Sequence, residues 1–168
     1  IIILIIAAGY VLFISEENML MAETKLIQLP KPLNKGNISL EEAIFKRRSQ
    51  RSFEQKDLSL QQISQLLWAG QGITAEKGSH GLRTAPSAGA LYPIEIYLLA
   101  KNGLFRYLPD GHKLESLGEQ DLRGALADSS SGQAAISQAP VNIVICAVYS
   151  RVTSKYGQRG IRYAHIEV

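Results

Sequence analysis

The sequence predicts an α+β domain in which helices pack on a sheet. Apolar residues recur at helical spacing after Ser39 and again after Ser59. Residues 94–100 and 141–149 are short apolar runs rich in branched side chains, which is typical of strands. Helices are therefore expected before, between and after strands, without a regular βαβ alternation. No Gly-x-Gly-x-x-Gly follows a predicted strand, so a Rossmann nicotinamide site is not supported.

Size and charge limit the function classes. A chain of 168 residues is long enough for one domain with its own core. The net charge is only +3, and the basic residues gather in two short clusters, Lys46–Arg51 and Arg151–Arg162. Such clusters suit a small anionic ligand better than a nucleic acid, although a solvated charged face would look the same. The single cysteine, Cys146, excludes an internal disulfide, and no Cys/His spacing predicts a metal site.

The first fourteen residues are almost wholly apolar. A membrane span needs about 20 residues, so this run fits a signal, an N-terminal anchor or a translated leader instead. We assign residues 1–22 to this leader, outside the fold, and favour export or anchoring slightly over a cytoplasmic location. Residues 23–37 contain Pro30, Pro32 and Gly36 and are expected to form an extended arm. The domain itself is expected over residues 38–168.

Capping boxes mark the first two helices. Ser39 with Glu42, and Ser59 with Gln62, have the spacing at which each pair satisfies backbone N–H groups at a helix start. Gly70 is expected to end the second helix.

The rest of the chain predicts a hairpin and two more helices. Asp110-Gly111 between two apolar runs predicts a hairpin turn. Thr74–Arg83 is expected to be a mobile loop, and Glu119–Asp128 a helix. The helical pattern of Ile161–Val168 stops without a terminating residue, so we expect the chain to end inside a helix.

Basic and hydroxyl side chains crowd together where the first helix ends. Residues 47–53, Arg-Arg-Ser-Gln-Arg-Ser-Phe, hold three guanidinium groups and two hydroxyls. Guanidinium forks pair bidentately with phosphate oxygens, and alternate residues of an extended segment project to one side. This segment could therefore cradle a phosphate. A basic helix end that complements the helix dipole is the competing interpretation.

Two further segments border predicted strands. Residues 85–93, Ala-Pro-Ser-Ala-Gly-Ala-Leu-Tyr-Pro, are small enough to let a backbone approach a flat ligand, with Ser87 and free amides as hydrogen-bond donors. Residues 155–163, Lys-Tyr-Gly-Gln-Arg-Gly-Ile-Arg-Tyr, follow the second strand. Lys155 and Tyr156 could donate and accept protons if nearby cations lowered their pKa values. The alternative for residues 85–93 is a tight structural loop, and the alternative for residues 155–163 is a solvated loop.

In this order and spacing the three segments resemble the nitroreductase superfamily, and most closely its SagB/ThcOx-type branch. That branch includes azoline oxidases of peptide natural products. The segment Gln62–Thr74 also matches, and the resemblance runs from about Leu26 to Val168. It implies a nitroreductase-like three-layer fold with a central, mainly antiparallel sheet flanked by helices, and a homodimer with FMN at the subunit interface. The family continues past the final helix, so we expect the C-terminal part of the fold to be missing here.

The resemblance also assigns roles by position. Arg47, Arg48, Ser49 and Arg51 match the residues that hold the FMN phosphate, ribityl chain and pyrimidine edge. A loop given by the partner subunit lies along the flavin, and it is matched here by Pro86, Ser87, Ala88, Gly89 and Ala90. Plain nitroreductases usually carry Asn where Ala90 stands. Lys155 and Tyr156 match the pair proposed for proton transfer in azoline oxidases and are the expected catalytic residues.

The expected function is therefore an FMN-dependent oxidoreductase. It would move a hydride through the flavin to or from a small or peptide-derived substrate, with NAD(P)H as a candidate reductant. The alternative is a non-catalytic flavin- or anion-binding domain that the apolar leader tethers to a membrane.

Overall fold

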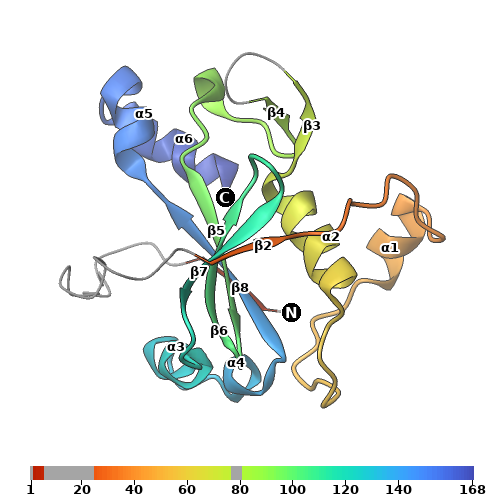
Figure 1. Ribbon diagram of the computed structural model, residues 1–168. Coiled ribbons are helices and arrows are strands. Elements are labelled where there is room, and N and C mark those ends of the chain that lie inside the picture. Colours follow the sequence, from red (N-terminus) through yellow and green to blue (C-terminus); the bar gives the residue numbers. More distant parts are fainter. Residues whose placement is uncertain (1, 6–24, 77–80) are drawn as a thin grey trace.

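An antiparallel sheet forms the centre of the structure (Figure 1), a computed structural model that describes residues 2–5, 25–76 and 81–168. The strand order is β1-β8-β5-β6-β7-β2. These strands are β1 (Ile2–Ile5), β2 (Leu26–Gln28), β5 (Ile94–Ala100), β6 (Gly103–Leu108), β7 (Lys113–Gly118) and β8 (Val141–Ala147). Neighbouring strands pair antiparallel, except that β1 runs parallel to β8.

Helices surround this sheet. They are α1 (Leu40–Lys46), α2 (Leu60–Gln71), α3 (Arg123–Ser129), α4 (Ala134–Gln138), α5 (Tyr149–Tyr156) and α6 (Arg159–Glu167). In Figure 1, α2 lies beside the sheet, α3 and α4 lie at one end of it, and α5 and α6 lie at the other end. The predicted class, α+β with a mainly antiparallel sheet flanked by helices, is confirmed.

The helix α2 forms the core together with one face of the sheet. Leu67 is fully buried and packs in one cluster with Ile96, Leu98 and Phe105. A Cβ at Gly70 would lie 2.6 Å from the Cδ1 atom of Ile96. Gly70 is therefore not the helix stop that the sequence predicts; it lies inside α2 and lets the helix approach β5 closely.

The capping box of α2 and the hairpin form as predicted, whereas at α1 only half of the box forms: Ser39 accepts from the Glu42 amide at 3.2 Å, and the Glu42 carboxylate pairs with Lys46 instead. Ser59 accepts a hydrogen bond from the Gln62 amide at 3.3 Å, and the Gln62 side chain accepts one from the Ser59 amide at 2.8 Å. At the β6–β7 turn, Gly111 has a φ of 71°, which glycine adopts readily.

Three segments differ from the expectation. The segment expected to be a mobile loop contains a small hairpin of β3 (Ile73–Ala75) and β4 (Leu82–Arg83), with residues 77–80 outside the described part. The segment 155–163, for which a solvated loop was the alternative, is mostly helical, because α5 begins soon after β8 and α6 follows after a short turn. The helix expected over Glu119–Asp128 begins later, at Arg123, and α4 was not foreseen.

The structure describes only part of the apolar leader. Residues 2–5, which the sequence analysis leaves outside the fold, form the edge strand β1 beside β8. A run of branched apolar residues suits a strand as well as a leader, so the pattern alone did not separate the two. The remainder of the leader, residues 6–22, lies outside the described residues. Within the described ranges, no helix is long and apolar enough to cross a bilayer.

A histidine ties the arm to the core. The His112 imidazole lies 2.8 Å from the Ser64 hydroxyl and 3.0 Å from the Pro30 carbonyl through Nε2, and 2.9 Å from the Tyr107 hydroxyl through Nδ1. Ser64 itself donates to the Pro30 carbonyl at 2.6 Å. A neutral imidazole with its proton on Nε2 satisfies all of these contacts. Burial lowers the pKa of His112, and the hydrogen bond to Pro30 opposes this shift.

We predict that His112→Ala lowers the free energy of unfolding by about 1–3 kcal/mol, because the buried Tyr107 hydroxyl loses its partner and buried Ser64 keeps only its bond to Pro30. The folded-state pKa of His112 lies below its unfolded value, so its contribution is present at neutral pH and is lost as pH falls below about 6.5. Urea unfolding at pH 7.5 and pH 5.5 checks both points. The control is His165→Ala, at an exposed histidine whose ring lies 2.9 Å from the Tyr149 hydroxyl. A difference from wild type that stays constant with pH would contradict the neutral imidazole.

Candidate functional site

The small-residue loop between β4 and β5 has a tightly constrained backbone. Residues 88–90 form the short helical turn η2. Gly89, Ala90 and Tyr92 have φ angles of 66°, 55° and 44°, an arrangement that is uncommon for residues other than glycine. The Tyr92 amide donates to the Ser87 hydroxyl oxygen at 2.8 Å, and the Tyr92 hydroxyl donates to the Gly81 carbonyl at 3.1 Å. Backbone strain of this kind is often kept where function requires a fixed geometry.

Lys155 and Tyr156 lie directly against this loop. They end α5, and a Cβ added to Gly89 would be 2.5 Å from the Tyr156 hydroxyl oxygen and 3.0 Å from Lys155 Nζ. The Tyr156 ring meets the Tyr163 ring edge-on, with 5.1 Å between the centroids. Arg159 in turn donates to the Tyr163 hydroxyl at 2.6 Å. Two of the three predicted segments therefore meet in space, and they present an ammonium and a phenol beside a bare backbone.

The third segment lies elsewhere. Arg47, Arg48, Ser49 and Arg51 follow α1 and are all exposed. Arg47 caps α1 through its amide, which donates to the Ile44 carbonyl at 3.3 Å. Arg48 Nη1 donates to the carbonyls of Phe45 and Arg47 at 2.9 and 2.7 Å, so its guanidinium completes the helix end. In Figure 1, α1 lies across the molecule from α5. One chain alone does not bring the basic segment to the loop.

Sequence reasoning missed a partly buried cluster of polar side chains around Tyr92, behind the loop. The guanidinium carbon of Arg83 lies 4.1 Å from the centroid of the Tyr92 ring, and Nη1 donates to Gln71 at 3.0 Å. Burial lowers the pKa of Arg83. Arg151 donates to the Tyr92 carbonyl at 3.2 Å and forms an ion pair with Glu95. These residues come from five separate elements or loops, so no local spacing could have pointed to them.

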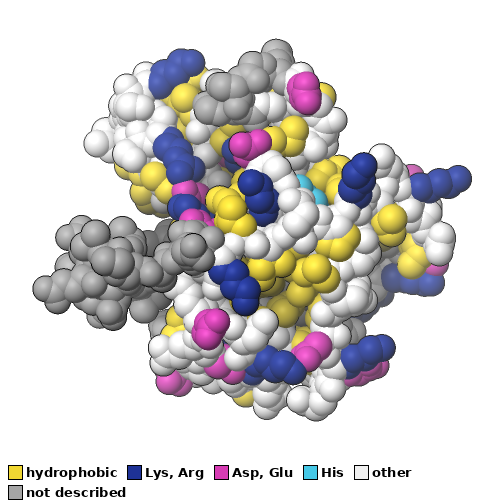
Figure 2. All heavy atoms as spheres, in the orientation of Figure 1, with side chains coloured by type: hydrophobic (Ala, Val, Ile, Leu, Met, Phe, Trp, Pro, Cys, Tyr) yellow, Lys and Arg dark blue, Asp and Glu magenta, His cyan; other side chains and the backbone are white. Residues whose placement is uncertain are grey.

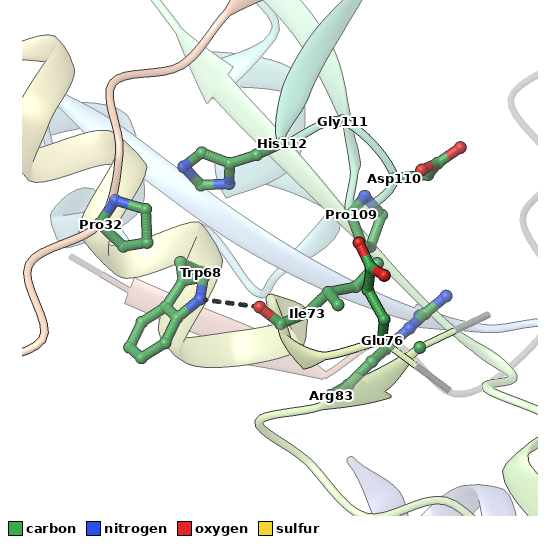
Figure 3. Close-up of a pocket in the computed structure, with 10 residues that line it drawn as sticks. Pro32, Trp68, Ile73, Glu76, Arg83, Pro109, Asp110, Gly111 and His112 are labelled. Atoms are coloured by element: carbon green, nitrogen blue, oxygen red, sulfur yellow. Dashed lines mark hydrogen bonds between the residues drawn. The ribbon is translucent and has the colours of Figure 1, made fainter. Parts of the chain in front are cut away.

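A cavity of about 530 Å³ lies between α2, the β3–β4 hairpin and the β6–β7 turn (Figure 3). Trp68, Arg83, Pro109 and His112 are among its lining residues, and the Trp68 indole donates to the Ile73 carbonyl at 3.4 Å. None of the residues predicted for the site lines it. In the described part of the chain, no group of three or more His, Cys, Asp or Glu side chains could hold a metal ion.

Comparison with known proteins identifies the family. The profile of the nitroreductase family matches residues 44–168, a range that contains all three segments. The chain belongs to the nitroreductase family. The resemblance predicted from the motifs is thus confirmed.

The relatives of this nitroreductase-family chain are of two kinds. It is 38% identical over 154 residues to "Putative nitroreductase MJ1384" of Methanocaldococcus jannaschii, covering 88% of this chain and 75% of that protein. A crystal structure of a "putative nitroreductase" from Ralstonia eutropha superposes with a TM-score of 0.72 at 31% identity, covering 88% of this chain and 68% of that one. The microcin B17-processing protein McbC of Escherichia coli is 30% identical over 96 residues, which is 51% of this chain and 35% of McbC.

We predict that Gly89→Ala displaces Lys155 and Tyr156 without unfolding the chain, because the clashing atoms are the ends of flexible side chains. The control is Gly132→Ala, since Gly132 has the same φ of 66° but nothing within 4 Å of the added Cβ. Both variants should lose about 1–2 kcal/mol of stability from the left-handed backbone. Only Gly89→Ala should shift the NMR resonances of the Tyr156 ring. A Tyr156 signal that stays at its wild-type position in Gly89→Ala would refute the contact.

Proposed function

We propose that this nitroreductase-family oxidoreductase is FMN-dependent and holds its flavin between two copies of the chain. This proposal is based mainly on one observation: the predicted site residues lie in two separate groups. The loop Pro86–Ala90 lies with Lys155 and Tyr156 at one end of the sheet, whereas the basic segment after α1 lies on the other side of the molecule. In a two-fold dimer, the basic segment of each chain can lie against the loop Pro86–Ala90 of its partner.

The exposed apolar side chains of α1 favour contact with a second copy of the chain. Leu40, Ile44 and Phe45 on this helix are 71%, 66% and 78% exposed. Figure 2 shows hydrophobic and basic side chains together at the right-hand side of the molecule, where α1 lies. Large apolar side chains gathered on a short helix favour burial against another protein surface. Arg47 and Arg51 directly follow this helix, so a partner that covers α1 would also approach the basic segment.

The residues fit the chemistry of FMN. Arg47 and Arg51 are exposed cations that can pair with a phosphate, with the Ser49 hydroxyl between them, while Arg48 is already engaged by its own helix end. The loop Pro86–Ala90 offers a bare backbone to a flat ring, and Gly89 has no side chain in the way. FMN, when bound, supplies the hydride-transfer chemistry.

Lys155 and Tyr156 are the proposed proton-transfer pair. Lys155 is exposed and Tyr156 is half-buried beside Gly89, so both side chains can reach a substrate that lies on the loop. The ammonium can donate a proton and the phenol can donate or, when ionised, accept one.

The substrate is proposed at the level of a class. The relative McbC, a microcin-processing protein, favours a peptide-derived substrate of the SagB/ThcOx type, such as a thiazoline or oxazoline ring. The more extensive likeness to MJ1384 favours a small acceptor that is reduced with electrons from NAD(P)H. Turnover with an azoline-containing peptide, compared with turnover of a nitroaromatic compound and NADPH, separates these two versions.

Removal of the Arg47 and Arg51 guanidinium groups should weaken FMN binding. We predict that Arg47→Ala with Arg51→Ala raises the FMN dissociation constant at least about tenfold, because charge-assisted hydrogen bonds to phosphate are lost. The effect should be larger at low salt, where charges are less screened. Flavin fluorescence titration measures the constant. Lys31→Ala with Lys35→Ala removes the same charge from the exposed arm and should leave binding unchanged. Equal affinities of the two double variants would contradict the phosphate assignment.

Loss of the Tyr156 hydroxyl should separate flavin binding from turnover. We predict that Tyr156→Phe keeps FMN bound and still reducible by dithionite, while turnover of an azoline-containing peptide falls by roughly 10²–10⁴-fold. Occupancy and turnover are measured on the same preparation. Tyr149→Phe, at the other end of α5, removes a hydroxyl that is paired with His165 and serves as the control. Undiminished turnover in Tyr156→Phe at full occupancy would remove its catalytic role.

A further inference from the structure

The turn between α5 and α6 brings a second tyrosine against Tyr156. Gly157 ends α5 with a φ of 57°, a positive value that glycine adopts readily, and α6 begins two residues later. A Cβ added to Gly160 would lie 2.7 Å from the Val152 carbonyl oxygen, so the lack of a side chain there lets the two helices approach closely. Tyr163 lies one turn further along α6, on the same side as Gly160, and therefore faces α5.

The ring of Tyr163 is held from two sides. It meets the Tyr156 ring edge to face, with the centroids 5.1 Å apart and the ring planes at 89°. Arg159 Nη2 donates to the Tyr163 hydroxyl at 2.6 Å, and the guanidinium carbon lies 5.7 Å from the ring centroid. Arg159 and Tyr163 are four positions apart on α6, so they are neighbours on one face of the helix. The Tyr163 ring is thus fixed between a guanidinium group and the Tyr156 ring.

This ring bears on the position of the Tyr156 hydroxyl. On the side of the loop, a Cβ added to Gly89 would lie 2.5 Å from the Tyr156 hydroxyl oxygen. A half-buried tyrosine at the end of a helix can adopt more than one rotamer. An edge-to-face contact between aromatic rings favours one arrangement over the others by about three- to tenfold. The Tyr163 ring therefore favours the rotamer in which the Tyr156 hydroxyl lies over Gly89.

We propose that Tyr163 is a positioning residue for proton transfer: its ring, which Arg159 holds, keeps the Tyr156 hydroxyl over the bare backbone of Gly89. This inference rests on the proposed function and adds to it two residues that the proposed chemistry does not use. A general acid or base contributes only when it lies within hydrogen-bond reach of the proton that it transfers. Loss of the Tyr163 ring should therefore lower turnover and leave the flavin bound.

The test separates the ring of Tyr163 from its hydroxyl. Tyr163→Leu removes the ring, whereas Tyr163→Phe keeps the ring and removes the hydroxyl that Arg159 holds. The nuclear Overhauser effect (NOE) between the Tyr156 ring protons and the Gly89 α protons reports the position of Tyr156, with or without FMN. This NOE should weaken about three- to tenfold in Tyr163→Leu and stay within about twofold of wild type in Tyr163→Phe. Arg159→Met removes the same hydrogen bond as Tyr163→Phe and should have the same small effect.

Turnover should follow the NOE. At full FMN occupancy, kcat should fall about three- to tenfold in Tyr163→Leu with KM nearly unchanged, and Tyr163→Phe should restore most of it. In a Tyr156→Phe background, Tyr163→Leu should lower kcat no further, because it acts through a phenol that is already absent.

Tyr149→Leu is the matched control. Tyr149 and His165 also pair edge-on between α5 and α6, with 5.7 Å between the ring centroids. Tyr149 begins α5, two turns before Tyr156, so its loss removes an aromatic contact between the same two helices away from Gly89. The NOE and kcat should stay at their wild-type values in Tyr149→Leu.

An unchanged NOE in Tyr163→Leu would overturn the inference, and so would an equal loss in Tyr149→Leu or a further fall of kcat in the Tyr156→Phe background. If Tyr163→Leu does not fold, Tyr163→Met replaces it with the same expected results, because its flexible side chain fills the space without a ring. A chain that binds no FMN, or full turnover in Tyr156→Phe, would contradict the proposed function. The NOE comparison would still decide whether Tyr163 positions Tyr156.

Discussion

The pairing of β5 with β8 decides where the candidate site forms. The two strands are antiparallel, and Ile94 at the start of β5 lies opposite Ala147 at the end of β8. The segment before β5 and the segment after β8 must therefore meet at one end of the sheet. The Val148 amide donates to the Pro93 carbonyl at 2.8 Å and closes this corner. The loop Pro86–Ala90 and the helix that ends in Lys155 and Tyr156 are the two segments that this register joins.

The position of α5 at this corner brings its side chains to the loop. The short connection from β8 to α5 leaves Lys155 and Tyr156 two turns of helix away from the strand, which is far enough to reach over Gly89. Arg151, one turn earlier on α5, bonds the Tyr92 carbonyl and so ties the helix to the loop from the other side. The absence of a side chain at Gly89 is what lets the two segments approach each other.

Much of the fold could be predicted because its signals are local. The capping box of Ser59 and Gln62 and the Asp110-Gly111 turn each depend on a few neighbouring residues, and both formed as predicted. The hairpin of β3 and β4 was missed because its strands are only three and two residues long, too short to show a period. A solvated loop was the alternative left open for residues 155–163, yet Gly160 is buried inside α6. A Cβ there would lie 2.7 Å from the Val152 carbonyl.

The candidate site was predictable only in part, because only its individual segments have local signals. The three segments could be recognised by their residues, but the sequence could not tell which of them meet within one chain. That relation depends on strand register and on the packing of α1, which no short motif encodes. The contacts of Arg83 and Arg151 with Tyr92 were not predictable either, because β4, the loop before β5, and α5 meet only in the folded chain.

The central claim, that two copies of the chain share each site, is tested most directly by mixing two impaired variants at an FMN concentration that fills the wild-type site but not that of the arginine variant. One chain carries Arg47→Ala with Arg51→Ala, and the other carries Tyr156→Phe. In a shared arrangement, a mixed dimer has one site with both defects and one site with neither. Equal amounts, unfolded and refolded together, should regain about a quarter of the wild-type activity, since half of the dimers are mixed and each has one intact site. Activity that never exceeds that of the separate variants would show that each chain builds its site alone.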